Sequence, residues 1–502
     1  MREEYFPTIG LEIHIELKTR SKMFCSCKND SQEKEPNVNI CPVCLGHPGT
    51  LPVINREAVR KVIKTGIALN CKIAPWSFFE RKNYFYPDLP KGYQISQYQK
   101  PLCENGFLII FGKKIRIRRI HLEEDTARLI HPQGADYSLL DFNRAGIPLM
   151  ELVTEPDMVS AQEAKKFAQE LQLILRYLDV SDADMEKGQM RVEANISLSQ
   201  KSKVLPARQA GKSQKWGTKV EIKNLNSFKA VERAIEYEIE RQKEILESGG
   251  EVIQETRGWD DKKGKTISQR IKEEAHDYRY FPEPDLPPLE IDAYYLEEIK
   301  QEIPELPQEK RIRFLQEYGI AETKIETLIN NKELTEYFEK SSSELIRWVE
   351  DKNLKNKQGK LLEMLANYLI GDGIGLLKGK PFEEKSYPIT PENFAEFITI
   401  IEERNLTSRM AKILLEEMFK TGKDPSDILE EKKFVQVSEK SEVKKIAKKI
   451  IQDNPKPVQD FLAGKENAIQ FLIGQMMKET KGMVDPNKAK EILIKLLKDS
   501  KS

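Results

Sequence analysis

The sequence predicts an α+β protein in which an N-terminal domain built on an antiparallel sheet is followed by an all-α domain and an α-helical tail. Three observations carry this prediction. Several segments before residue 290 alternate apolar and polar residues, as half-buried strands do. Beyond residue 290, apolar residues recur at the spacing of amphipathic helices. Four prolines within residues 282–288 separate the two parts, because neither a helix nor a central strand tolerates that density.

The chain of 502 residues is longer than one hydrophobic core usually serves. We place one domain boundary at the proline-rich segment and another after the break at residues 378–393. The expected domains are residues 1–291, with a cysteine-rich insertion at 25–44, then the helical residues 292–400 and the tail 401–502.

Composition narrows the class of protein. The formal net charge is zero, so there is no overall basic excess to attract nucleic acid, although a local basic face is compatible with it. No apolar run approaches the roughly 18 residues of a membrane span, and the N-terminus lacks the apolar core of a signal peptide. We therefore expect a cytoplasmic protein without a membrane partner, whose six cysteines do not form disulfides.

The strands and helices of the first domain are predicted by periodicity and by capping residues. Strand-like alternation occurs at residues 10–17, 114–125, 190–198 and 218–225. One helix begins after Ser160, where Glu163 completes a capping box. A second helix spans about Ser227 to Glu247 and ends before two glycines. Helical spacing returns at residues 394–403, 408–419, 441–453 and 487–499.

Four cysteines have the spacing of a zinc site. Cys25 and Cys27 form one close pair, and Cys41 and Cys44 form a second pair. Thirteen residues lie between the two pairs. The loop between the pairs is polar and could not become ordered by packing, whereas a bound metal would order it. Four sulfurs leave no open coordination position, so we expect a structural Zn²⁺ site; the alternative is a set of unrelated surface cysteines.

Carboxylates recur on the predicted strands. Glu12 and His14 share one face of the first strand, and further acids lie on three others, at Glu123, Glu124 and Asp125, at Glu193 and at Glu221. A single acid on a strand usually faces solvent, but several converging acids would repel each other without a cation between them. Oxygen ligands with one imidazole favour Mg²⁺ or Mn²⁺. The sequence does not decide whether these strands converge.

A magnesium site of this kind suggests phosphoryl transfer. The segment 258–266 resembles a P-loop, but it has five residues between its glycines instead of four and carries two aspartates where phosphates would lie, so we interpret it as a turn. Cations for phosphate are available in residues 80–98, which contain Arg81, Lys82 and Lys91. Tyr84 and Asp88 lie in the same stretch, whose tyrosines could line a pocket. A tyrosine-rich surface loop is the alternative interpretation.

A family resemblance is carried by these stretches in chain order: GLEIHIELKTRSKMFC, CPVCLGHPGTLPVIN, RKNYFYPDLPKGYQISQY, HLEEDTARL, DFNRAGIPLMELVTEPD, EIKNLNSF and DYRYFPEPDLPPL. Together they resemble the B subunits of the aspartyl/glutamyl-tRNA amidotransferases, the GatB family. The C-terminal stretch AIQFLIGQMMKETKGMVDPNKA resembles the tail of that family, which is related to the YqeY module.

The resemblance implies a heterotrimer in which this chain joins an A subunit and a small C subunit. The A subunit would hydrolyse glutamine to ammonia. It implies that the B subunit uses ATP and Mg²⁺ to phosphorylate the side-chain carboxylate of Glu-tRNA(Gln) and, in many members, Asp-tRNA(Asn), and that ammonia then displaces the phosphate. It further implies a cradle domain distantly similar to glutamine synthetase, followed by a helical domain and a tail that contact tRNA.

The resemblance also assigns roles to residues. Magnesium would be bound by Glu12, His14, Glu124, Glu193 and Glu221. ATP would contact Lys82, Tyr84 and Asp88, and the catalytic set would be Glu12, His14, Lys82 and Glu124. Strand alternation places Glu123 and Glu124 on opposite faces, and Glu124 is chosen from the family match. Glu193 stands where family members often have Asp, so its metal contact and the choice among these acids stay open.

Two other functions are weighed against this one. A zinc-stabilised tRNA adaptor would not gather acids on its strands, because they repel phosphate. A self-sufficient glutaminase would need an activated nucleophile, and Cys71 and Cys103 lie in stretches with no evident paired base. We expect no ammonia production from glutamine by this chain alone.

Overall fold

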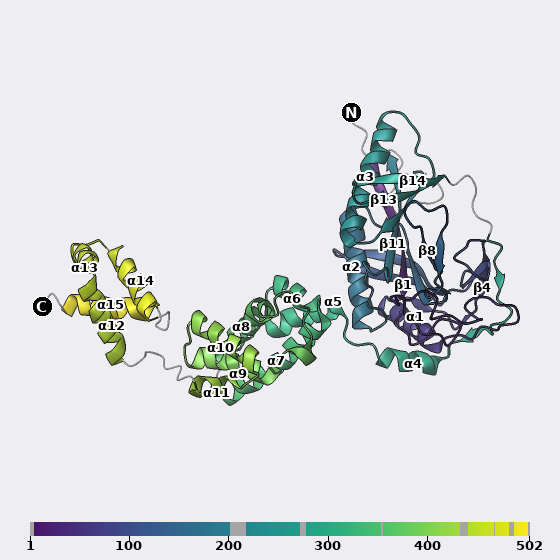
Figure 1. Cartoon of the computed structure of the whole chain (residues 1–502). Coiled ribbons are helices and arrows are strands. Elements are labelled where there is room, and N and C mark those ends of the chain that lie inside the picture. Colours follow the sequence, from purple (N-terminus) through teal and green to yellow (C-terminus); the bar gives the residue numbers. More distant parts are fainter. Residues whose placement is uncertain are drawn as a thin grey trace. The chain divides into compact units, whose positions relative to one another are not determined.

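The computed structural model describes residues 5–200, 217–271, 278–352, 355–431, 440–465, 467–480 and 486–499. The chain forms two compact units, Met1–Pro307 and Gln308–Ser502 (Figure 1). The first unit is a mixed α+β structure around a large, mostly antiparallel sheet, and the second unit is helical. This confirms the coarse fold class expected from the sequence. Residues 201–216 and 481–485, which fall in predicted parts of the first domain and the tail, lie outside the described residues.

The main sheet has nine strands, and the N-terminal strand lies at its centre. Neighbouring strands are antiparallel except β12 and β13, which are parallel. In spatial order the strands are β14 (Lys265–Ile271), β13 (Glu255–Asp260), β12 (Val220–Leu225), β11 (Met190–Gln200), β1 (Tyr5–Glu16), β10 (Pro148–Thr154), β7 (Lys113–Glu124), β6 (Cys103–Ile110) and β2 (Lys72–Ile73).

The two faces of the sheet differ in polarity, because successive side chains of a strand point to opposite sides. On β1, Ile9, Leu11, Ile13 and Ile15 are at most 1 % exposed and belong to the core of the first unit. The other face of the same stretch carries Gly10 and three polar residues, Glu12, His14 and Glu16.

Two long helices, α2 (Ala161–Tyr177) and α3 (Phe228–Glu247), cover the apolar face (Figure 1). Both begin where the sequence predicts. Ser160 Oγ accepts a hydrogen bond from Glu163 N at 3.2 Å, and Ser227 Oγ accepts one from Ala230 N at 3.0 Å. The Glu163 carboxylate accepts from Val159 N instead of the cap residue itself, so the predicted capping box is shifted by one residue on that side.

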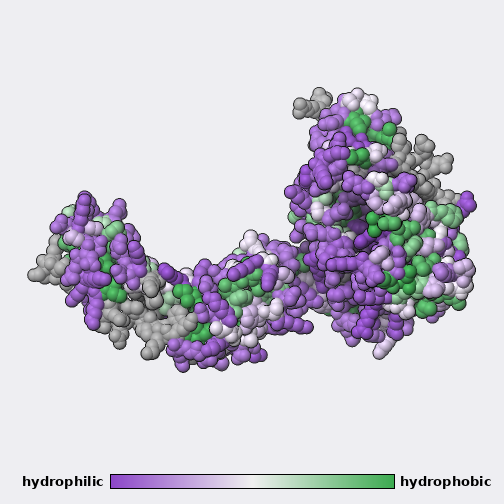
Figure 2. All heavy atoms as spheres, in the orientation of Figure 1, coloured by the Kyte–Doolittle hydropathy of each residue, from purple (hydrophilic) through white to green (hydrophobic). Residues whose placement is uncertain are grey.

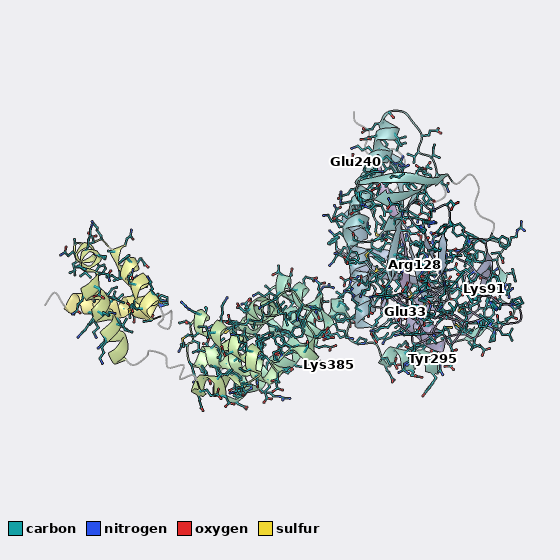
Figure 3. All side chains as sticks on the ribbon, in the orientation of Figure 1. Glu33, Lys91, Arg128, Glu240, Tyr295 and Lys385 are labelled. Carbon is teal, nitrogen blue, oxygen red and sulfur yellow. The ribbon has the colours of Figure 1, made fainter. Side chains whose placement is uncertain are left out.

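Short strands cover part of the polar face, on the side of the sheet away from α2 and α3 (Figure 1). They form three small sheets: β15 (Phe281–Pro282), β4 (Glu80–Asn83) and β5 (Tyr93–Ser96); β16 (Leu289–Glu290) and β3 (Trp76–Ser77); and β8 (Arg128–Ile130) and β9 (Leu139–Asp141). The helices α1 (Arg56–Ala68) and α4 (Ala293–Gln301) complete this unit. In Figure 3, Glu240 on α3 and Lys91 near β4 mark its two sides.

The second unit consists of helices. They are α5 (Pro307–Arg313), α6 (Glu322–Ile329), α7 (Lys332–Asp351), α8 (Gln358–Asn367), α9 (Pro391–Glu403), α10 (Ser408–Thr421), α11 (Pro425–Glu431), α12 (Lys440–Asp453), α13 (Pro455–Leu462), α14 (Ala468–Glu479) and α15 (Pro486–Asp499). The helices α12, α14 and α15 share a core of their own that includes Ala447, Leu472 and Leu493. Within the described residues, each helix is too short or too polar to cross a lipid bilayer.

Candidate active site

The polar face of the sheet gathers acids and imidazoles around His14. The Nε2 atom of His14 lies 3.5 Å from Glu151 Oε2, 3.8 Å from Glu123 Oε1 and 3.9 Å from Glu12 Oε1. Glu151 is directly opposite His14 in the β1–β10 pair, and Glu12 is two residues away on β1. Antiparallel register thus places these side chains on one face. Glu12 and His14, which the sequence predicts as partners, do lie together.

A second histidine extends this group. His121 of β7 is opposite Glu151 in the β10–β7 pair, and its Nε2 lies 3.4 Å from Glu151 Oε2 and 3.6 Å from Glu123 Oε2. His121, Glu123 and Glu151 are 2 %, 2 % and 5 % exposed. Two carboxylates at this depth require nearby positive charge, because an uncompensated buried charge is costly.

The protonation equilibria reflect this crowding. Burial and the charge of Glu151 raise the pKa of Glu12 to about 7. Burial alone would lower the pKa of His14, but a hydrogen bond to Glu151 and the charges of the acids around it raise that pKa to about 9. The pKa of Glu151 lies well below its usual value, since the positive charges of His121 and His14 outweigh the effect of burial. Without a metal, His14 therefore supplies part of the missing positive charge.

Lysines lie on two sides of the acids. Lys82 of β4 lies 5.0 Å from the centre of the Tyr278 ring and 6.0 Å from that of Tyr84. Burial lowers the pKa of Lys82, but the charges of Glu123 and Glu151 raise it by more. On the other side, Lys223 Nζ of β12 donates to Glu193 Oε1 at 3.0 Å. We call the part of the polar face formed by Glu12, His14, His121, Glu123 and Glu151 the acidic face. The ammonium groups of Lys82 and Lys223 are suited to bind anionic groups that enter it.

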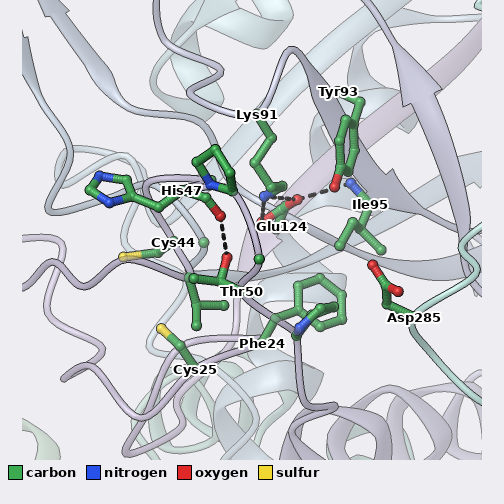
Figure 4. Close-up of a pocket in the computed structure, with 16 residues that line it drawn as sticks. Phe24, Cys25, Cys44, His47, Thr50, Lys91, Tyr93, Ile95, Glu124 and Asp285 are labelled. Atoms are coloured by element: carbon green, nitrogen blue, oxygen red, sulfur yellow. Dashed lines mark hydrogen bonds and ion pairs between the residues drawn. The ribbon is translucent and has the colours of Figure 1, made fainter.

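The adjacent acids Glu123 and Glu124 point in opposite directions. Glu123 lies in the cluster and accepts a hydrogen bond from Ser96 Oγ at 3.1 Å. Glu124 instead accepts from Lys91 Nζ at 2.7 Å and from Ile95 N at 2.9 Å. Lys91 and Glu124 line a cavity of about 230 Å³ that also contacts Cys25 and Cys44 (Figure 4). The structure thus places Glu123, and not Glu124, beside His14.

The other sequence-predicted acids lie on the neighbouring strands β11 and β12 and in the loop after β4. Glu193 is opposite Glu12 in the β1–β11 pair and is held by Lys223. Glu221 lies one strand further and accepts a hydrogen bond from Thr256 Oγ1 at 2.7 Å. Asp88 lies in the loop after Tyr84, where its carbonyl accepts from Ala127 N and burial raises the pKa of its carboxyl.

The residues of the acidic face fit a divalent cation. One ligand atom each of Glu12, His14 and Glu151 lies within 4.8 Å of the other two, and the same holds for His121, Glu123 and Glu151. Three carboxylates with imidazole nitrogen are a donor set suited to Mg²⁺ or Mn²⁺. A cation here would also offset the repulsion between the buried carboxylates.

The four cysteines of the insertion come together as predicted. All are free thiols, and their four sulfurs lie within 4.8 Å of one another. Tetrahedral zinc with Zn–S bonds of about 2.3 Å needs sulfurs roughly 3.8 Å apart, so a small contraction suffices. A hydrogen bond from Cys25 and the charge of Lys22 lower the pKa of Cys44 to about 5 against the effect of burial, so this sulfur is a ready thiolate ligand.

Sequence reasoning missed Glu151 and His121 and left the choice of Glu123 open. A signal for Glu151 was present: it is a single carboxylate inside the apolar strand PLMELVT, where five of the other six residues are buried. A lone acid in such a strand cannot face solvent from either side. His121 belongs to the same strand as Glu123 and shares its face, two residues away.

Comparison with known proteins gives two family matches along the chain. Residues 7–297 match the GatB/GatE catalytic domain, and residues 352–497 match the GatB domain. The chain is 47 % identical over 499 residues to the B subunit of the aspartyl/glutamyl-tRNA(Asn/Gln) amidotransferase from Persephonella marina, covering 99 % of this chain and 100 % of that protein.

The corresponding proteins of Caldicellulosiruptor bescii and Thermotoga maritima are each 46 % identical, over 497 and 501 residues. Those matches cover 98 % of this chain and 98 % and 99 % of the relatives. The chain belongs to the GatB family. It is one subunit of an amidotransferase, and the enzyme class is that of ligases used in translation. The acidic face lies wholly within the part that matches the catalytic domain.

Proposed function

We propose that this chain uses ATP and Mg²⁺ to phosphorylate the side-chain carboxylate of Glu-tRNA(Gln) and of Asp-tRNA(Asn), and that ammonia from a partner A subunit then replaces the phosphate. A carboxylate is a poor electrophile for ammonia, whereas an acyl phosphate carries a good leaving group. The observation that carries the proposal is the cluster of Glu12, His14, Glu123 and Glu151 on one face of the sheet.

In this proposal Glu12, His14 and Glu151 bind the cation, with Glu123 and His121 beside them. Glu193 and Glu221 belong to the outer part of the same face. Glu124 is held by Lys91 outside the cluster, and its catalytic role stays a prediction. When bound, Mg²⁺ neutralises charge on the phosphate being transferred. The acids orient the cation, and their burial keeps water away from the reacting carboxylate.

Lys82 holds an anion on the opposite side of the cluster from Lys223. Its ammonium group is enclosed by Tyr84 and Tyr278, so it has few positions available and can be aimed at a phosphate or at the substrate carboxylate. Tyr84 and Asp88 would line the nucleotide site. The stacked rings of Tyr98 and Tyr280, with centroids 4.4 Å apart, add a flat apolar surface next to Lys82.

In this proposal the chain has three domains and acts together with two partner subunits. Residues 1–291 are a cradle domain related to glutamine synthetase, with a structural Zn²⁺ bound by Cys25, Cys27, Cys41 and Cys44. Residues 292–400 and the YqeY-related tail 401–502 contact tRNA. The chain acts in the cytoplasm in a heterotrimer with A and C subunits.

Exposed apolar side chains support a partner interface. Leu51, Val53 and Phe85 are 65 %, 73 % and 92 % exposed, although most large apolar side chains of the first unit are buried. Figure 2 shows hydrophobic residues gathered on the side of the first unit where β4 lies in Figure 1.

The test uses the chain purified with its A and C partners. Glu-tRNA(Gln), ATP, Mg²⁺ and ammonium chloride are supplied without glutamine, and ADP and Gln-tRNA(Gln) are followed together. We expect both products from the wild type and neither from Glu12→Gln, with tRNA affinity retained. Full activity of Glu12→Gln would move the chemistry to another chain and leave this one as a tRNA-binding scaffold.

A further inference from the structure

The four-cysteine insertion, residues 25–44, contacts the acidic face at two places. The first contact is direct. Ser31 Oγ, between the two cysteine pairs, donates to Glu16 Oε2 at 2.7 Å. Glu16 is 8 % exposed and lies two residues from His14 on the same face of β1. A charge-assisted bond to a buried carboxylate fixes its orientation.

The second contact passes through the loop at residues 141–146. Val38 N and Asn39 N donate to Asn143 Oδ1 at 2.9 and 2.8 Å, and Asn143 Nδ2 donates to Glu35 O at 2.7 Å. Asn37 binds the same loop, with Phe142 N donating to its Oδ1 at 2.7 Å. These hydrogen bonds join the insertion to this loop.

The loop at 141–146 in turn holds Asp125. Gly146 N donates to Asp125 O at 2.9 Å, and Asp125 N donates to Ile147 O at 2.8 Å. The Asp125 carboxylate accepts from Arg191 Nη2 at 2.6 Å. Arg191 is directly opposite His14 in the β1–β11 pair.

The two contacts converge. Glu16 lies two residues from His14 on β1, and Arg191, which binds the Asp125 carboxylate, lies opposite His14 on β11. Both routes from the insertion thus end at neighbours of His14 in the sheet, the first at Glu16 and the second, through Asp125, at Arg191.

A buried lysine joins the cysteines to this network. Lys22 is fully buried, with its Nζ 3.2 Å from Phe142 O and 3.9 Å from Cys44 Sγ. Lys22 Nζ donates both to Phe142 O and to Cys44 Sγ, so it links the cysteine cluster directly to the loop at 141–146.

We propose that the cysteine insertion positions the acidic face, with Ser31 as a positioning residue that acts through Glu16 on the ligand row of β1. The insertion lacks an apolar core, so zinc supplies its order. The proposal deepens the function proposed above and rests on it. It predicts that the hydroxyl of Ser31 matters for the acidic face even when zinc stays bound.

The test compares Ser31→Ala, which removes the donor, with Ser31→Thr, which keeps it. Both are prepared in the full complex, and Lys34→Ala, an exposed change in the same loop, is the matched control. Three quantities are measured: zinc per chain, Mn²⁺ affinity of the acidic face by electron paramagnetic resonance, and kcat and KM for ammonium-dependent Gln-tRNA(Gln) formation.

We expect Ser31→Ala to retain one zinc per chain and its KM for tRNA, but to lose about tenfold in Mn²⁺ affinity and in kcat, as loss of one charge-assisted hydrogen bond would give. Ser31→Thr and Lys34→Ala should match the wild type. Wild-type Mn²⁺ affinity in Ser31→Ala would overturn the proposal, as would zinc loss that Ser31→Thr does not repair. A wild type that binds Mn²⁺ but forms no Gln-tRNA(Gln) would refute the proposed function. The Mn²⁺ affinities of the variants would still test the positioning role of Ser31.

Discussion

His14 Nε2 lies 3.5 Å from Glu151 Oε2, the carboxylate of the residue directly opposite it on the neighbouring strand β10. Glu151 also lies 3.4 Å from His121 Nε2 on the next strand. One carboxylate is therefore shared by two imidazoles from two other strands. It stands at the centre of the acidic face.

Replacing that carboxylate should be more damaging than replacing any acid at the edge of the cluster. We expect Glu151→Gln to lower ammonium-dependent Gln-tRNA(Gln) formation by about 100-fold or more, because it removes a charged oxygen from both possible ligand groups. Steady-state rates with saturating tRNA would measure this. Glu240→Gln, on the outer surface of α3, is the control, and comparable rates for the two variants would contradict the central role of Glu151.

Substitutions of the neighbours Glu123 and Glu124 should have different effects on metal affinity. Glu123→Gln should weaken Mn²⁺ binding at least about tenfold, since this carboxylate lies 3.8 Å from His14. Glu124→Gln should leave Mn²⁺ affinity within about twofold while breaking the ion pair with Lys91. Electron paramagnetic resonance of bound and free Mn²⁺ gives both affinities. The reverse order would return Glu124 to the metal site.

The metal-free protein should lose stability as the pH rises. Glu12 has a folded pKa of about 7 against 4.5 unfolded, so the cost of ionising it grows from about pH 4.5 and is complete above 7. His14 has a folded pKa of about 9 against 6.5 unfolded, so its stabilising contribution is present below pH 6.5 and lost on approaching 9.

Added Mg²⁺ should reverse this trend, because it binds ionised Glu12 and neutral His14. We expect the rise in unfolding temperature on adding Mg²⁺ to be larger at pH 9 than at pH 6. Differential scanning fluorimetry of the wild type and Glu12→Gln would show it, with the variant lacking the part of the trend between about pH 4.5 and 7. An equal Mg²⁺ effect at both pH values would argue against a metal at these residues.

Loss of one cysteine should release zinc and destabilise the first unit. We expect Cys44→Ser to bind less than stoichiometric zinc and to leave the buried ammonium of Lys22 without its thiolate. Breaking a buried ion pair costs about 3–5 kcal/mol, and a large domain loses roughly 2–4 °C of unfolding temperature per kcal/mol, so a fall of about 6–20 °C is expected. Cys71→Ser, outside the cluster, should retain zinc. Full zinc in Cys44→Ser would exclude the four-sulfur site.

Removal of the C-terminal helices should weaken tRNA binding but leave metal binding at the acidic face unchanged. Ending the chain after Glu431 removes α12 to α15, which share a hydrophobic core of their own. We expect tRNA affinity to fall about tenfold or more, with weaker dependence on salt, because lysine contacts to phosphate are lost. The acidic face should still bind Mn²⁺ as the full chain does. Unchanged tRNA affinity would show that the tail has another partner.

Local signals were enough to predict much of the fold. Ser160 and Ser227 begin their helices as predicted because capping depends on a few neighbouring residues. The alternation of Glu12 and His14 with buried isoleucines predicted the strand and its polar face. The parallel pairing of β12 with β13 was not predicted, because strand direction depends on how the chain returns between them.

The membership of the site depends on pairing between distant strands. Glu151 meets His14 because residues 148–154 lie beside residues 5–16, a neighbour relation that no local pattern encodes. The choice between Glu123 and Glu124 likewise depends on the register of β7 against β10. The four cysteines, by contrast, are predicted by spacing alone, since one metal needs only short loops to collect them.

The central place of β1 also sets the order of events during synthesis. The central strand β1 has as its two neighbours β10 and β11, which end at residues 154 and 200. At roughly 5–20 residues per second, His14 waits about 10–40 s before both flanking strands exist. During that interval the apolar side chains of β1 are unpaired and available to chaperones or to other nascent chains. The site around His14 therefore cannot be completed until the chain has been synthesised to residue 200.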